Sequence, residues 1–409
     1  MGKTGARLKY VIIQCDGMPD RPLDALDGRT PLEAAPTPNL DKLAREGRFG
    51  LCRVIPEGFP PGSDVGNLSI FGYEPARYFT GRSPLEAAAM GVPLGADDVA
   101  FRCNLVTLRE EPEGEIMEDF ACGHIPDADS HAIVRRLEEK LGGGPFSFHP
   151  GVSYRHLLVW HGGKDAMVTT PPHDISDRLV APYLPRGEGA DTLLDLMKSA
   201  REILRDDPVN ARRAARKERA ASSIWLWGQG RATVLAPFES LHGKRGGAIS
   251  AVDIIRGIAS LAGMRIIKVP GITGWTDTNY EGKASFAMEA LGDLDLAFIH
   301  IEATDESAHQ GDADAKVQAI ADIDARVLGP LLKGLPALGP FRLMVISDHP
   351  TPCALKTHTP EPVPFALWPA PEGLSASGAA GFTEAAAAAS GLTVDPGWTI
   401  MERFLAGDV

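Results

Sequence analysis

Two short motifs combine acidic and histidine side chains at spacings that could bind metal ions. Asp305 and His309 are four residues apart, so a helical turn would place both on one face, where they could share a cation. Asp348 and His349 end the apolar segment FRLMVISDH, and a turn there could direct both side chains to one point. Each motif also has a purely structural interpretation, as an acidic helix start with an incidental histidine or as a helix cap.

Three further residues carry groups of the same kinds. Asp16 ends the apolar run VIIQC, and His358 lies in the proline-rich segment KTHTPEPVPF. Ser63 follows a glycine, and the sequence after it predicts a helix whose N-terminus would favour a phosphate group. Taken alone, these residues could equally be a solvated acid, a structural histidine and an ordinary loop serine.

The motifs together point to phosphoryl transfer. Three acids and three histidines would supply oxygen and nitrogen ligands for two divalent ions, and these residues admit Mn, Co, Zn or Mg, with Mn or Zn favoured over Mg. Two metal ions about 4 Å apart stabilise both the attacking and the leaving oxygen of a phosphoryl displacement. Metal coordination also activates a serine hydroxyl, which is otherwise a poor nucleophile. The predicted set is Ser63 with Asp16, Asp305, His309, Asp348, His349 and His358.

Apolar runs that alternate with amphipathic segments predict the elements that position these residues. Strands alternating with helices indicate a mostly parallel α/β sheet, in which ligands bind beyond the carboxyl ends of the strands. Asp16, Glu302 and the pair Asp348-His349 all fall at such ends. The strands are expected at 9–15, 246–252, 265–271, 294–303, 341–349 and, as the last, 363–370, with helices starting near Thr37 and at 253–264, 312–335 and within 377–390.

The middle of the chain has a different pattern. Strands are expected at 99–108, 154–162 and 224–230, helices at 133–143 and 191–207, and a solvated basic helix face at 210–221. We therefore predict a discontinuous metal-binding catalytic core at 1–95 and 236–409, with an inserted smaller α/β domain at 96–235.

Composition narrows the class of protein. The 409 residues are 44% hydrophobic and carry a net charge of −13, which argues against binding to nucleic acid or an anionic membrane. The five cysteines are widely spaced and form no CxxC motif, so a reducing cytoplasm is expected rather than a disulfide framework. The N-terminal apolar run suggests a buried strand, not a signal peptide, and we find no run of the roughly 20 apolar residues that a membrane span requires.

Several motifs resemble those of the archaeal-type 2,3-bisphosphoglycerate-independent phosphoglycerate mutases of the alkaline phosphatase superfamily. They follow the family order along nearly the whole chain and include CDGMPD, TPNLDKLAREG, PPGSDVGNLSIFGY, YFTGRSPLEA, ATDESAHQGD and SDHPTPCALKTHTPEPVPF. The resemblance implies an alkaline-phosphatase-like core with an inserted substrate-clamping domain. It also implies a phosphoserine intermediate, two divalent metal ions and no 2,3-bisphosphoglycerate cofactor.

The resemblance also implies a role for individual residues. Asp305, His309 and His358 would bind one metal ion; the other would be bound by Asp16, Asp348 and His349, with Ser63 bridging to it as nucleophile. Asn67 would contact phosphate. Substrate contacts are implied for Arg82, Arg102, His124, Arg155, His173 and Asp174, although each arginine could instead form a surface or interdomain ion pair.

One loop departs from the family pattern and leaves the substrate open. Many members have an arginine-rich loop resembling DRRAGRI where this chain has DFACGHI at 119–125. The leading hypothesis is interconversion of 3-phosphoglycerate and 2-phosphoglycerate; the alternatives are a homoserine kinase or phosphatase of the same superfamily and a non-catalytic metal-stabilised binding protein. A GxxxxGK[ST] motif is absent, which weakens the nucleotide-dependent alternative. The sequence gives no indication of the oligomeric state.

Overall fold

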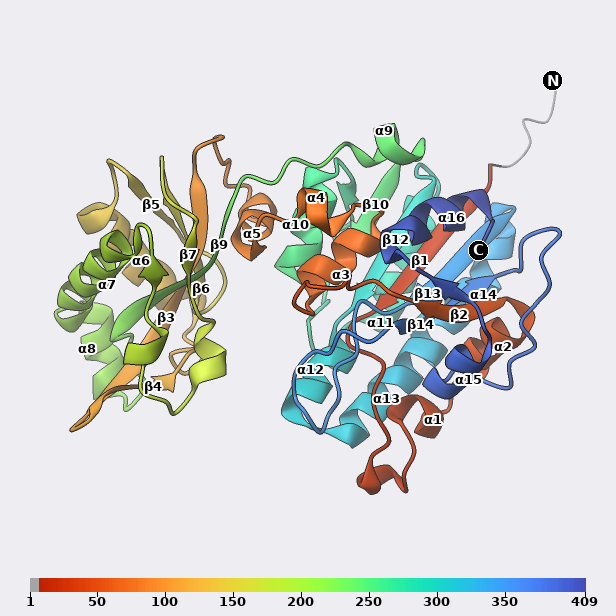
Figure 1. The fold of residues 1–409 in the computed structure, drawn as a ribbon, viewed down its shortest axis with the longest axis horizontal. Coiled ribbons are helices and arrows are strands. Elements are labelled where there is room, and N and C mark those ends of the chain that lie inside the picture. The colour runs from red at the N-terminus through yellow and green to blue at the C-terminus, as the bar shows by residue number, and fades with distance from the viewer. Residues whose placement is uncertain (1–6) are drawn as a thin grey trace. The chain divides into compact units, whose positions relative to one another are not determined.

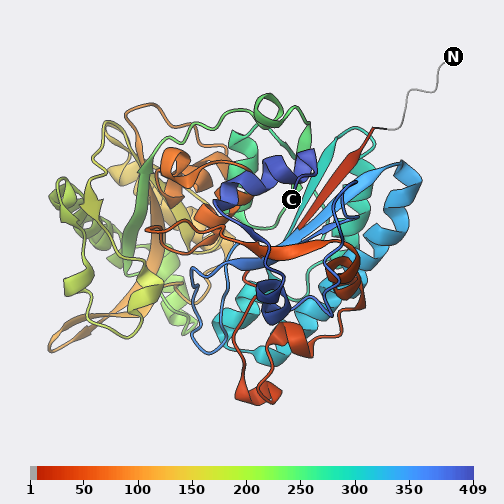
Figure 2. The ribbon, with the colours of Figure 1, turned by 45° about the vertical axis from the view of Figure 1, so that its right-hand side comes forward.

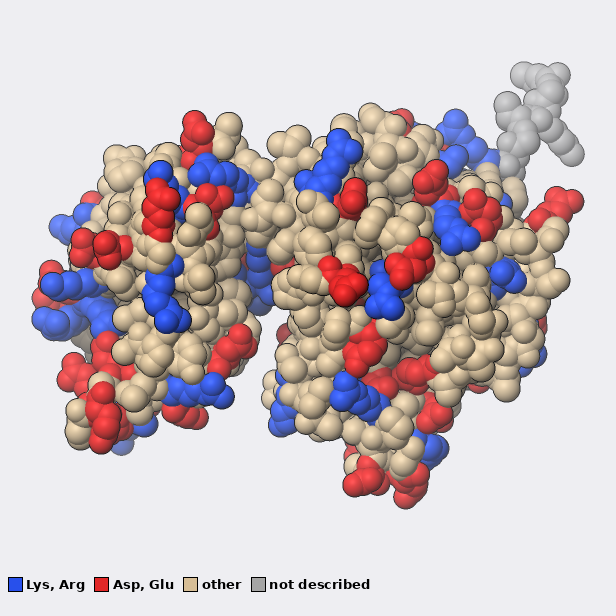
Figure 3. All heavy atoms as spheres, viewed as in Figure 1, with Lys and Arg blue, Asp and Glu red and all other residues tan. Residues whose placement is uncertain are grey.

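The computed structural model describes residues 7–409, which divide into two compact units (Figure 1). The core unit comprises the described residues up to Phe79 together with Val234–Val409, and the inserted unit comprises Thr80–Thr233. No helix among the described residues combines the length and apolar composition needed to cross a membrane. On the face drawn in Figure 3, acidic and basic side chains are interspersed over each unit.

The core unit is built on an eight-stranded sheet with the order β11-β10-β12-β1-β13-β14-β2-β15. The first five strands in this order are parallel to one another, whereas β14 is antiparallel to both its neighbours. The strands are β1 Lys9–Cys15, β2 Arg48–Cys52, β10 Gly246–Ile249, β11 Arg265–Ile266, β12 Leu296–Ile301, β13 Phe341–Ile346, β14 Val363–Trp368 and β15 Thr393–Val394. The predicted mostly parallel α/β sheet is therefore confirmed.

Helices cover both faces of this sheet, as Figures 1 and 2 show. Alternate residues of β1 point to opposite faces, and all are buried from Tyr10 onward, which explains the continuous apolar run. Val11 and Ile13 pack with apolar residues of α2, α11 and α13. The helices of this unit are α1 Pro31–Ala34, α2 Pro38–Glu46, α3 Ser63–Ile70, α4 Pro75–Tyr78, α9 Phe238–His242, α10 Asp253–Leu261, α11 Tyr280–Ala290, α12 Ala303–Gln310, α13 Ala313–Asp322, α14 Gly329–Gly334, α15 Glu384–Ala389 and α16 Ile400–Ala406.

Three predictions for the core unit need correction. The strand expected to be the last is followed by β15. The helix expected without interruption at 312–335 contains a π-helical stretch, Ile323–Leu328, between α13 and α14. Within it, Asp324 accepts hydrogen bonds from the backbone N–H of Leu40 at 2.7 Å and of Asn39 at 3.3 Å, which satisfies two free donors at the start of α2. The spacing of apolar residues in the sequence does not distinguish a short π-helical stretch from a continuous α-helix. The strand expected at 265–271 is limited to β11, Arg265–Ile266, whereas the helix expected within 377–390 is confirmed by α15.

The inserted unit has an antiparallel sheet in which β3 pairs with β4, β6 and β9, and β6 pairs with β5. Its elements are α5 Arg82–Ala89, β3 Val99–Glu111, β4 Gly114–Asp119, α6 Asp127–Leu141, β5 Phe146–His149, β6 Arg155–Trp160, β7 Met167–Val168, β8 Arg186–Gly187, α7 Ala190–Arg205, α8 Pro208–Ala215 and β9 Ser223–Arg231. Alternate residues of β3 pack against α6 and α7 or face Ala87 of α5, so every residue from Val99 to Val106 is buried.

Candidate metal centre

Three adjacent parallel strands bring the acidic candidates together at one edge of the core sheet. The register pairs Cys15 of β1 with Ile301 of β12 and Gln14 of β1 with Ile346 of β13, so these strands end side by side. Asp16 directly follows β1, and Asp348 lies two residues beyond the end of β13; both are fully buried. This edge is where open parallel sheets bind their ligands.

The first group of candidate ligands is Asp305, His309 and His358. Helix α12 places Asp305 and His309 one turn apart on one face, with His309 Nε2 3.1 Å from Asp305 Oδ2. The loop after β13 brings His358 Nε2 within 3.5 Å of Asp305 Oδ1 and 3.0 Å of His309 Nε2. One nitrogen or oxygen of each residue therefore faces a common point, as metal ligands do.

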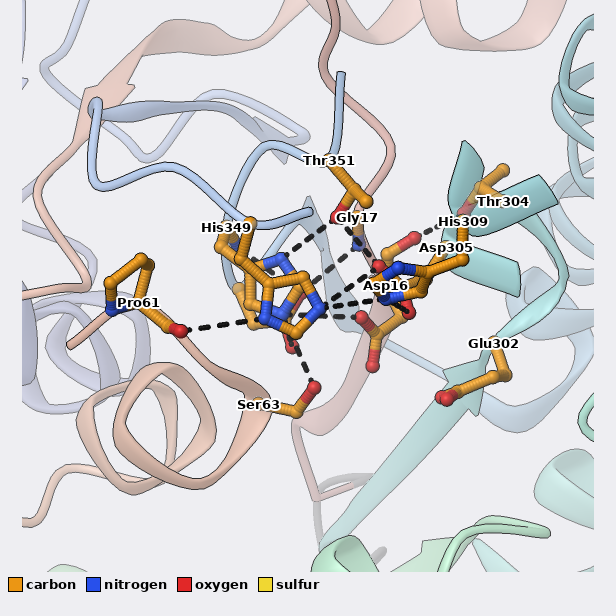
Figure 4. A network of polar contacts seen from close by, with 12 residues as sticks. Asp16, Gly17, Pro61, Ser63, Glu302, Thr304, Asp305, His309, His349 and Thr351 are labelled. Atoms are coloured by element: carbon orange, nitrogen blue, oxygen red, sulfur yellow. Dashed lines mark hydrogen bonds and ion pairs between the residues drawn. The ribbon is translucent and has the colours of Figure 1, made fainter. Parts of the chain in front are cut away.

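The second group is Asp16, Asp348 and His349, with Ser63 beside it. His349 Nε2 lies 3.5 Å from Asp16 Oδ1, 3.4 Å from Asp348 Oδ2 and 3.2 Å from Ser63 Oγ. Figure 4 shows Ser63 and His349 converging with Asp16 and Asp305 in one network. The structure thus brings together all seven residues for which the sequence predicts nucleophile or metal-ligand roles.

The hydrogen bonds of the histidine Nδ1 atoms indicate whether the Nε2 atoms are available to metal ions. His309 Nδ1 is 3.0 Å from the carbonyl oxygen of Lys356, and His358 Nδ1 is 3.4 Å from that of Pro61. Because a carbonyl only accepts hydrogen bonds, both Nδ1 atoms carry the proton, and a neutral ring then has a lone pair on Nε2. Two such lone pairs 3.0 Å apart repel each other, so the contact needs either a proton on one Nε2 or a metal ion that binds both.

The ring of His349 is oriented in the same way by Thr351. The Thr351 hydroxyl donates to Asp305 Oδ1 at 2.5 Å, so its oxygen is left to accept from His349 Nδ1 at 3.1 Å. His349 Nε2 then has a free lone pair directed at Ser63, Asp16 and Asp348. Thr351 thereby connects the two groups of ligands.

The shifted pKa values of the candidate ligands also indicate a site for cations. Burial and the neighbouring Asp348, Glu302 and Asp305 raise the pKa of Asp16 well above its usual range. Burial and Asp305 raise the pKa of Asp348 to about 7. Burial lowers the pKa of His309, but Asp305 outweighs this effect and the pKa rises to about 9. Metal-free protein would therefore retain protons here, and the carboxylates and imidazoles fit divalent ions that replace them.

Helix α3 holds the nucleophile candidate at its first residue. The partial positive charge of a helix N-terminus favours a phosphate beside Ser63. Asn67, one turn later, is fully buried, and its Nδ2 donates to Asp348 Oδ2 at 3.0 Å and to the Ser63 carbonyl at 2.9 Å. These two hydrogen bonds hold Ser63 and Asp348 in position, and the phosphate contact of Asn67 stays a prediction.

Sequence reasoning missed two groups beside the centre. His300 is fully buried, with its Nε2 2.9 Å from Asp16 Oδ2, and Glu302 was placed at a strand end without a role. His300 lies in β12 and Glu302 directly follows this strand, two residues later. Side chains two residues apart in a strand point to the same side, so this spacing could have identified both residues from the sequence. Thr351 carried no signal, because a threonine in a loop has many ordinary uses.

The remaining six candidates lie in the inserted unit. Arg82 Nε and Arg102 Nη1 lie 3.1 Å and 3.0 Å from Glu86 Oε1, and both guanidinium groups lie over the ring of Trp227. Burial lowers the pKa of Arg102 to about 10, Glu86 opposes this effect and Arg82 adds to it. The two arginines thus form a partly neutralised cationic site on an aromatic surface.

Aromatic contacts connect this site to the other candidates. The His173 ring lies 5.4 Å from Trp227 and 6.0 Å from Phe120, and its Nε2 is 3.7 Å from Asp174 Oδ1. Phe120 in turn contacts Tyr154, against which His124 and the guanidinium of Arg155 lie. We refer to Trp227, Phe120 and Tyr154 as the aromatic row.

The loop that departs from the family pattern is a compact turn in the inserted unit. Asp119 accepts hydrogen bonds from the backbone N–H of Ala121 at 2.7 Å and of Gly123 at 2.8 Å, and it also binds Arg219. Cys122, Gly123 and His124 have φ angles of 50°, 65° and 49°. The turn directs His124 toward the aromatic row.

The chain is similar to one family of known proteins. Residues 44–210 match the model of the 2,3-bisphosphoglycerate-independent phosphoglycerate mutases. The probable 2,3-bisphosphoglycerate-independent phosphoglycerate mutase of Geobacter sulfurreducens is 48% identical over 398 residues, covering 97% of this chain and 100% of that protein. The corresponding mutase of Methanothrix thermoacetophila is 47% identical over 401 residues, covering 98% of this chain and 100% of that protein.

Two solved structures agree with the fold described above. The PH0037 protein from Pyrococcus horikoshii is 28% identical, with a TM-score of 0.80 and coverage of 98% of this chain and 97% of that chain. The cofactor-independent phosphoglycerate mutase from Thermoplasma acidophilum is 25% identical, with a TM-score of 0.64 and coverage of 98% of this chain and 100% of that chain.

Proposed function

The chain belongs to the family of 2,3-bisphosphoglycerate-independent phosphoglycerate mutases, and from this premise we propose that it interconverts 3-phosphoglycerate and 2-phosphoglycerate through a phosphoserine on Ser63. The observation that carries the proposal is the position of Ser63 Oγ. It lies at a helix N-terminus, 3.2 Å from His349 Nε2 and beside both groups of candidate ligands. A nucleophile, a favourable phosphate position and ligands for cations thus coincide.

Two divalent ions would be held at this centre, one by Asp305, His309 and His358 and the other by Asp16, Asp348 and His349 with Ser63. When bound, they would lower the pKa of the serine hydroxyl and stabilise the charge of the transferring phosphoryl group. Three imidazoles among six ligands favour Mn²⁺ or Zn²⁺ over Mg²⁺, with Co²⁺ also compatible. In this proposal 2,3-bisphosphoglycerate is not needed, because Ser63 stores the phosphoryl group.

The reaction proceeds in two displacements. Ser63 Oγ loses its proton and forms a bond to the phosphorus of 3-phosphoglycerate, while the bond from phosphorus to the substrate 3-oxygen breaks and that oxygen gains a proton. Glycerate then turns, and its 2-hydroxyl takes the phosphoryl group from Ser63 by the reverse steps. The 3.2 Å separation of His349 Nε2 and Ser63 Oγ would allow both atoms to be ligands of the same ion, and this would keep Oγ directed at the phosphate.

The inserted unit supports a complementary role in holding glycerate. We assign the inserted unit, Thr80–Thr233, to substrate clamping and the core unit to metal binding and catalysis; the predicted bounds, 96–235 for the insertion, would instead leave Arg82 in the core. The guanidinium groups of Arg82, Arg102 and Arg155 suit a carboxylate, because their planar forks match its two oxygens. Holding glycerate away from water would also protect phosphoserine from hydrolysis. The partner is thus a small phosphorylated substrate.

The five cysteines support a cytoplasmic location for this activity. All five are buried and unpaired, as expected in a reducing compartment.

Replacing Ser63 tests the covalent route. The Ser63→Ala variant of the metal-reconstituted protein should lose at least about ten-thousandfold in turnover, because the nucleophile is absent. Ser69→Ala, on the same helix, is the matched control and should remain active. Production of 2-phosphoglycerate can be followed by ³¹P NMR, and phosphoserine by mass spectrometry of the quenched protein. Full activity in Ser63→Ala would refute the route.

The 119–125 turn supports one alternative, a homoserine kinase or phosphatase of the same superfamily. Its residues supply His124 where many family members have arginine, so the group bound there could differ. A substrate panel would decide between the functions, with 3-phosphoglycerate in one assay and ATP with homoserine in another. Release of inorganic phosphate would indicate a phosphatase. A protein that only binds its ligand would leave no phosphoserine with any substrate.

A further inference from the structure

A fully buried ion pair connects the segments that carry the candidate metal ligands. The ammonium of Lys316, on α13, lies 2.8 Å from Asp20 Oδ2, and both side chains are completely buried. The ammonium also donates to the carbonyl oxygen of Thr351 at 2.8 Å and to that of Pro19 at 3.3 Å. An ammonium has three protons, so these three acceptors satisfy it fully.

The acceptors of Lys316 belong to the two loops that supply ligands of the second group. Asp20 lies in the loop after β1, which begins with Asp16, and Thr351 lies in the loop after β13, just beyond His349. Lys316 itself belongs to the helix that follows α12 along the chain, and α12 carries ligands of the first group (Figure 1). One ammonium therefore joins three ligand-bearing parts of the core unit.

The loop after β1 also binds the loop after β13 directly. The Asp20 carboxylate accepts the backbone N–H of Cys353, at 3.0 Å to Oδ2, and the backbone N–H of Thr351 donates to the Pro19 carbonyl at 3.2 Å. The main chain of Thr351 is thus bonded on both sides, through its N–H to Pro19 and through its carbonyl to Lys316. A shift of either loop would break these bonds.

The position of Thr351 matters because its side chain contacts two candidate ligands. Its hydroxyl donates to Asp305 Oδ1 at 2.5 Å and accepts from His349 Nδ1 at 3.1 Å, as Figure 4 shows. Hydrogen bonds to the outer atoms of metal ligands fix the orientation of the ligands and strengthen metal binding. A displacement of the Thr351 main chain would therefore turn the His349 ring away from its ion.

Net stability alone does not account for the buried ion pair. Both charges lose their hydration on burial, and well-packed apolar side chains of similar volume are often at least as stabilising. The ammonium provides three directed hydrogen bonds instead, and these fix the distance between the two loops. Because Lys316 is part of the chain, this connection also persists when metal ions are removed.

We propose that Lys316 is a positioning residue of the metal centre, which holds the loops after β1 and β13 at the spacing that the two ions require. It acts through Asp20 and Thr351, and all three of its protons are directed at these loops. The inference extends the proposed function, because it rests on the proposed metal pair. Lys316 thereby sets the affinity for divalent ions although it is not a ligand.

Removal of the ammonium tests this role. Full-length, chelator-treated Lys316→Met should bind Mn²⁺ at least about tenfold more weakly than the unaltered protein, measured by calorimetric titration. Its melting temperature should also fall, because Asp20 is left buried without a countercharge. The matched control is Arg213→Met, which breaks a buried ion pair with Asp129 in the inserted unit. This control should lose thermal stability and keep its Mn²⁺ affinity.

A double variant separates positioning from stability. Lys316→Met combined with Asp20→Asn removes both charges and keeps a side-chain oxygen that can accept the Cys353 N–H. The melting temperature should recover relative to Lys316→Met, whereas the Mn²⁺ affinity should stay about tenfold weaker, because the Thr351 carbonyl still lacks its donor. If the affinity returned to that of the unaltered protein, Lys316 would have a structural role only and the proposal would be overturned. The double variant also provides the test if Lys316→Met does not fold.

The reactivity of Cys353 provides a readout that needs no metal ion. Its residue is 4% exposed, and its N–H is bonded to Asp20. In chelator-treated double variant, alkylation of Cys353 by iodoacetamide should be about tenfold faster than in the unaltered protein, because the loop after β13 opens more often. Peptide mass spectrometry would measure the rate, with the fully buried Cys52 of β2 as the internal control that stays unchanged. Equal rates at Cys353 in the two proteins would contradict the proposal.

These measurements use no substrate, so they separate the inference from the proposed function. A protein that does not interconvert the phosphoglycerates, but whose Mn²⁺ affinity depends on Lys316, would refute the function and retain the positioning role. An active protein whose Mn²⁺ affinity does not depend on Lys316 would retain the function and refute the role.

Discussion

The core unit and the inserted unit both gather ionisable side chains, but they handle charge in opposite ways. In the core unit, buried carboxylates such as Asp16 and Asp348 converge with histidine Nε2 atoms, so added cations are needed. In the inserted unit, Arg82 and Arg102 lie on the ring of Trp227, and their permanent charges are only partly offset by Glu86. One region is suited to metal ions and the other to an anion, so they should respond to different perturbations.

Among the changes that test this contrast between the two units, replacement of a metal ligand should have the largest effect. His309→Ala should remove one ion and lower kcat by at least about a thousandfold, because the site loses a neutral nitrogen ligand. Elemental analysis and the rate of 2-phosphoglycerate formation would measure the two effects. His161→Ala, which removes a half-exposed histidine paired with Asp98 in the inserted unit, is the control and should change neither. Unchanged metal content in His309→Ala would contradict the contrast between the regions.

The next largest effect is expected on the pH dependence of the thermal stability of metal-free protein. In the metal-free fold the pKa of Asp348 is raised from 3.8 to about 7 and that of His309 from 6.5 to about 9. Both folded values exceed the unfolded ones, so these groups stabilise the fold at low pH, and their contribution is lost as pH rises through about 7 and about 9. The contribution of Asp348 is lost between about pH 4 and 7 and that of His309 between about pH 6.5 and 9, so the melting temperature of metal-free protein should fall across these two ranges.

Metal ions should reverse this trend. Metal ions displace protons from their ligands. Below the pKa of a ligand, the metal affinity therefore rises about tenfold per pH unit for each displaced proton, or about a hundredfold over two units. Thermal unfolding of chelator-treated and Mn²⁺-loaded protein at several pH values would measure the difference. A gap between the two melting temperatures that narrows as pH rises would contradict the assignment of these groups as ligands.

A smaller effect is expected in the inserted unit. Arg155→Met should raise KM by about tenfold to a hundredfold while the metal content stays the same, because Arg155 is exposed beside Tyr154 and supplies charge to the substrate. The control is Arg135→Met on α6, also exposed, which should leave KM unchanged. If Arg155→Met altered metal content instead, the two regions would not have separate tasks.

The smallest effect is expected from Thr351. Thr351→Val should weaken metal binding by about tenfold, because it removes the acceptor for His349 Nδ1 and the donor to Asp305 but keeps every ligand. Calorimetric titration with Mn²⁺ would show it. Thr357→Val, at an exposed position of the same segment, is the control. Equal affinities in all three proteins would show that Thr351 does not orient the ring.

The sequence predicted the parts of the fold that depend on local pattern. Apolar runs ending in Asp16 and Asp348 identified parallel strands, whose carboxyl ends meet, and the spacing of Asp305 and His309 identified one helix face. The order of the strands and the reversed direction of β14 depend on how connections cross the sheet, which local pattern does not contain. Thr351 likewise acts through contacts that only the folded loop creates.

The inserted unit was less predictable for a different reason. Three of its strands, β3, β6 and β9, were found from their apolar runs, but the shorter β4, β5, β7 and β8 were not. The aromatic row depends on side chains from distant segments, Phe120, Tyr154 and Trp227. Each of these residues alone has the appearance of an ordinary core residue. The arginines were singled out by resemblance to a family, and that resemblance does not report which rings support them.

Two of the histidine rings in the core are oriented by main-chain carbonyls, those of Lys356 and Pro61, rather than by side chains. Since every amino acid offers the same carbonyl, evolution can change the residue at either position without disturbing the ring it holds. The number of residues between Asp348 and His358 is under a stricter limit, because an insertion or deletion there would move the carbonyl of residue 356 away from His309. Natural variation in this loop should therefore be rich in substitutions and poor in changes of length.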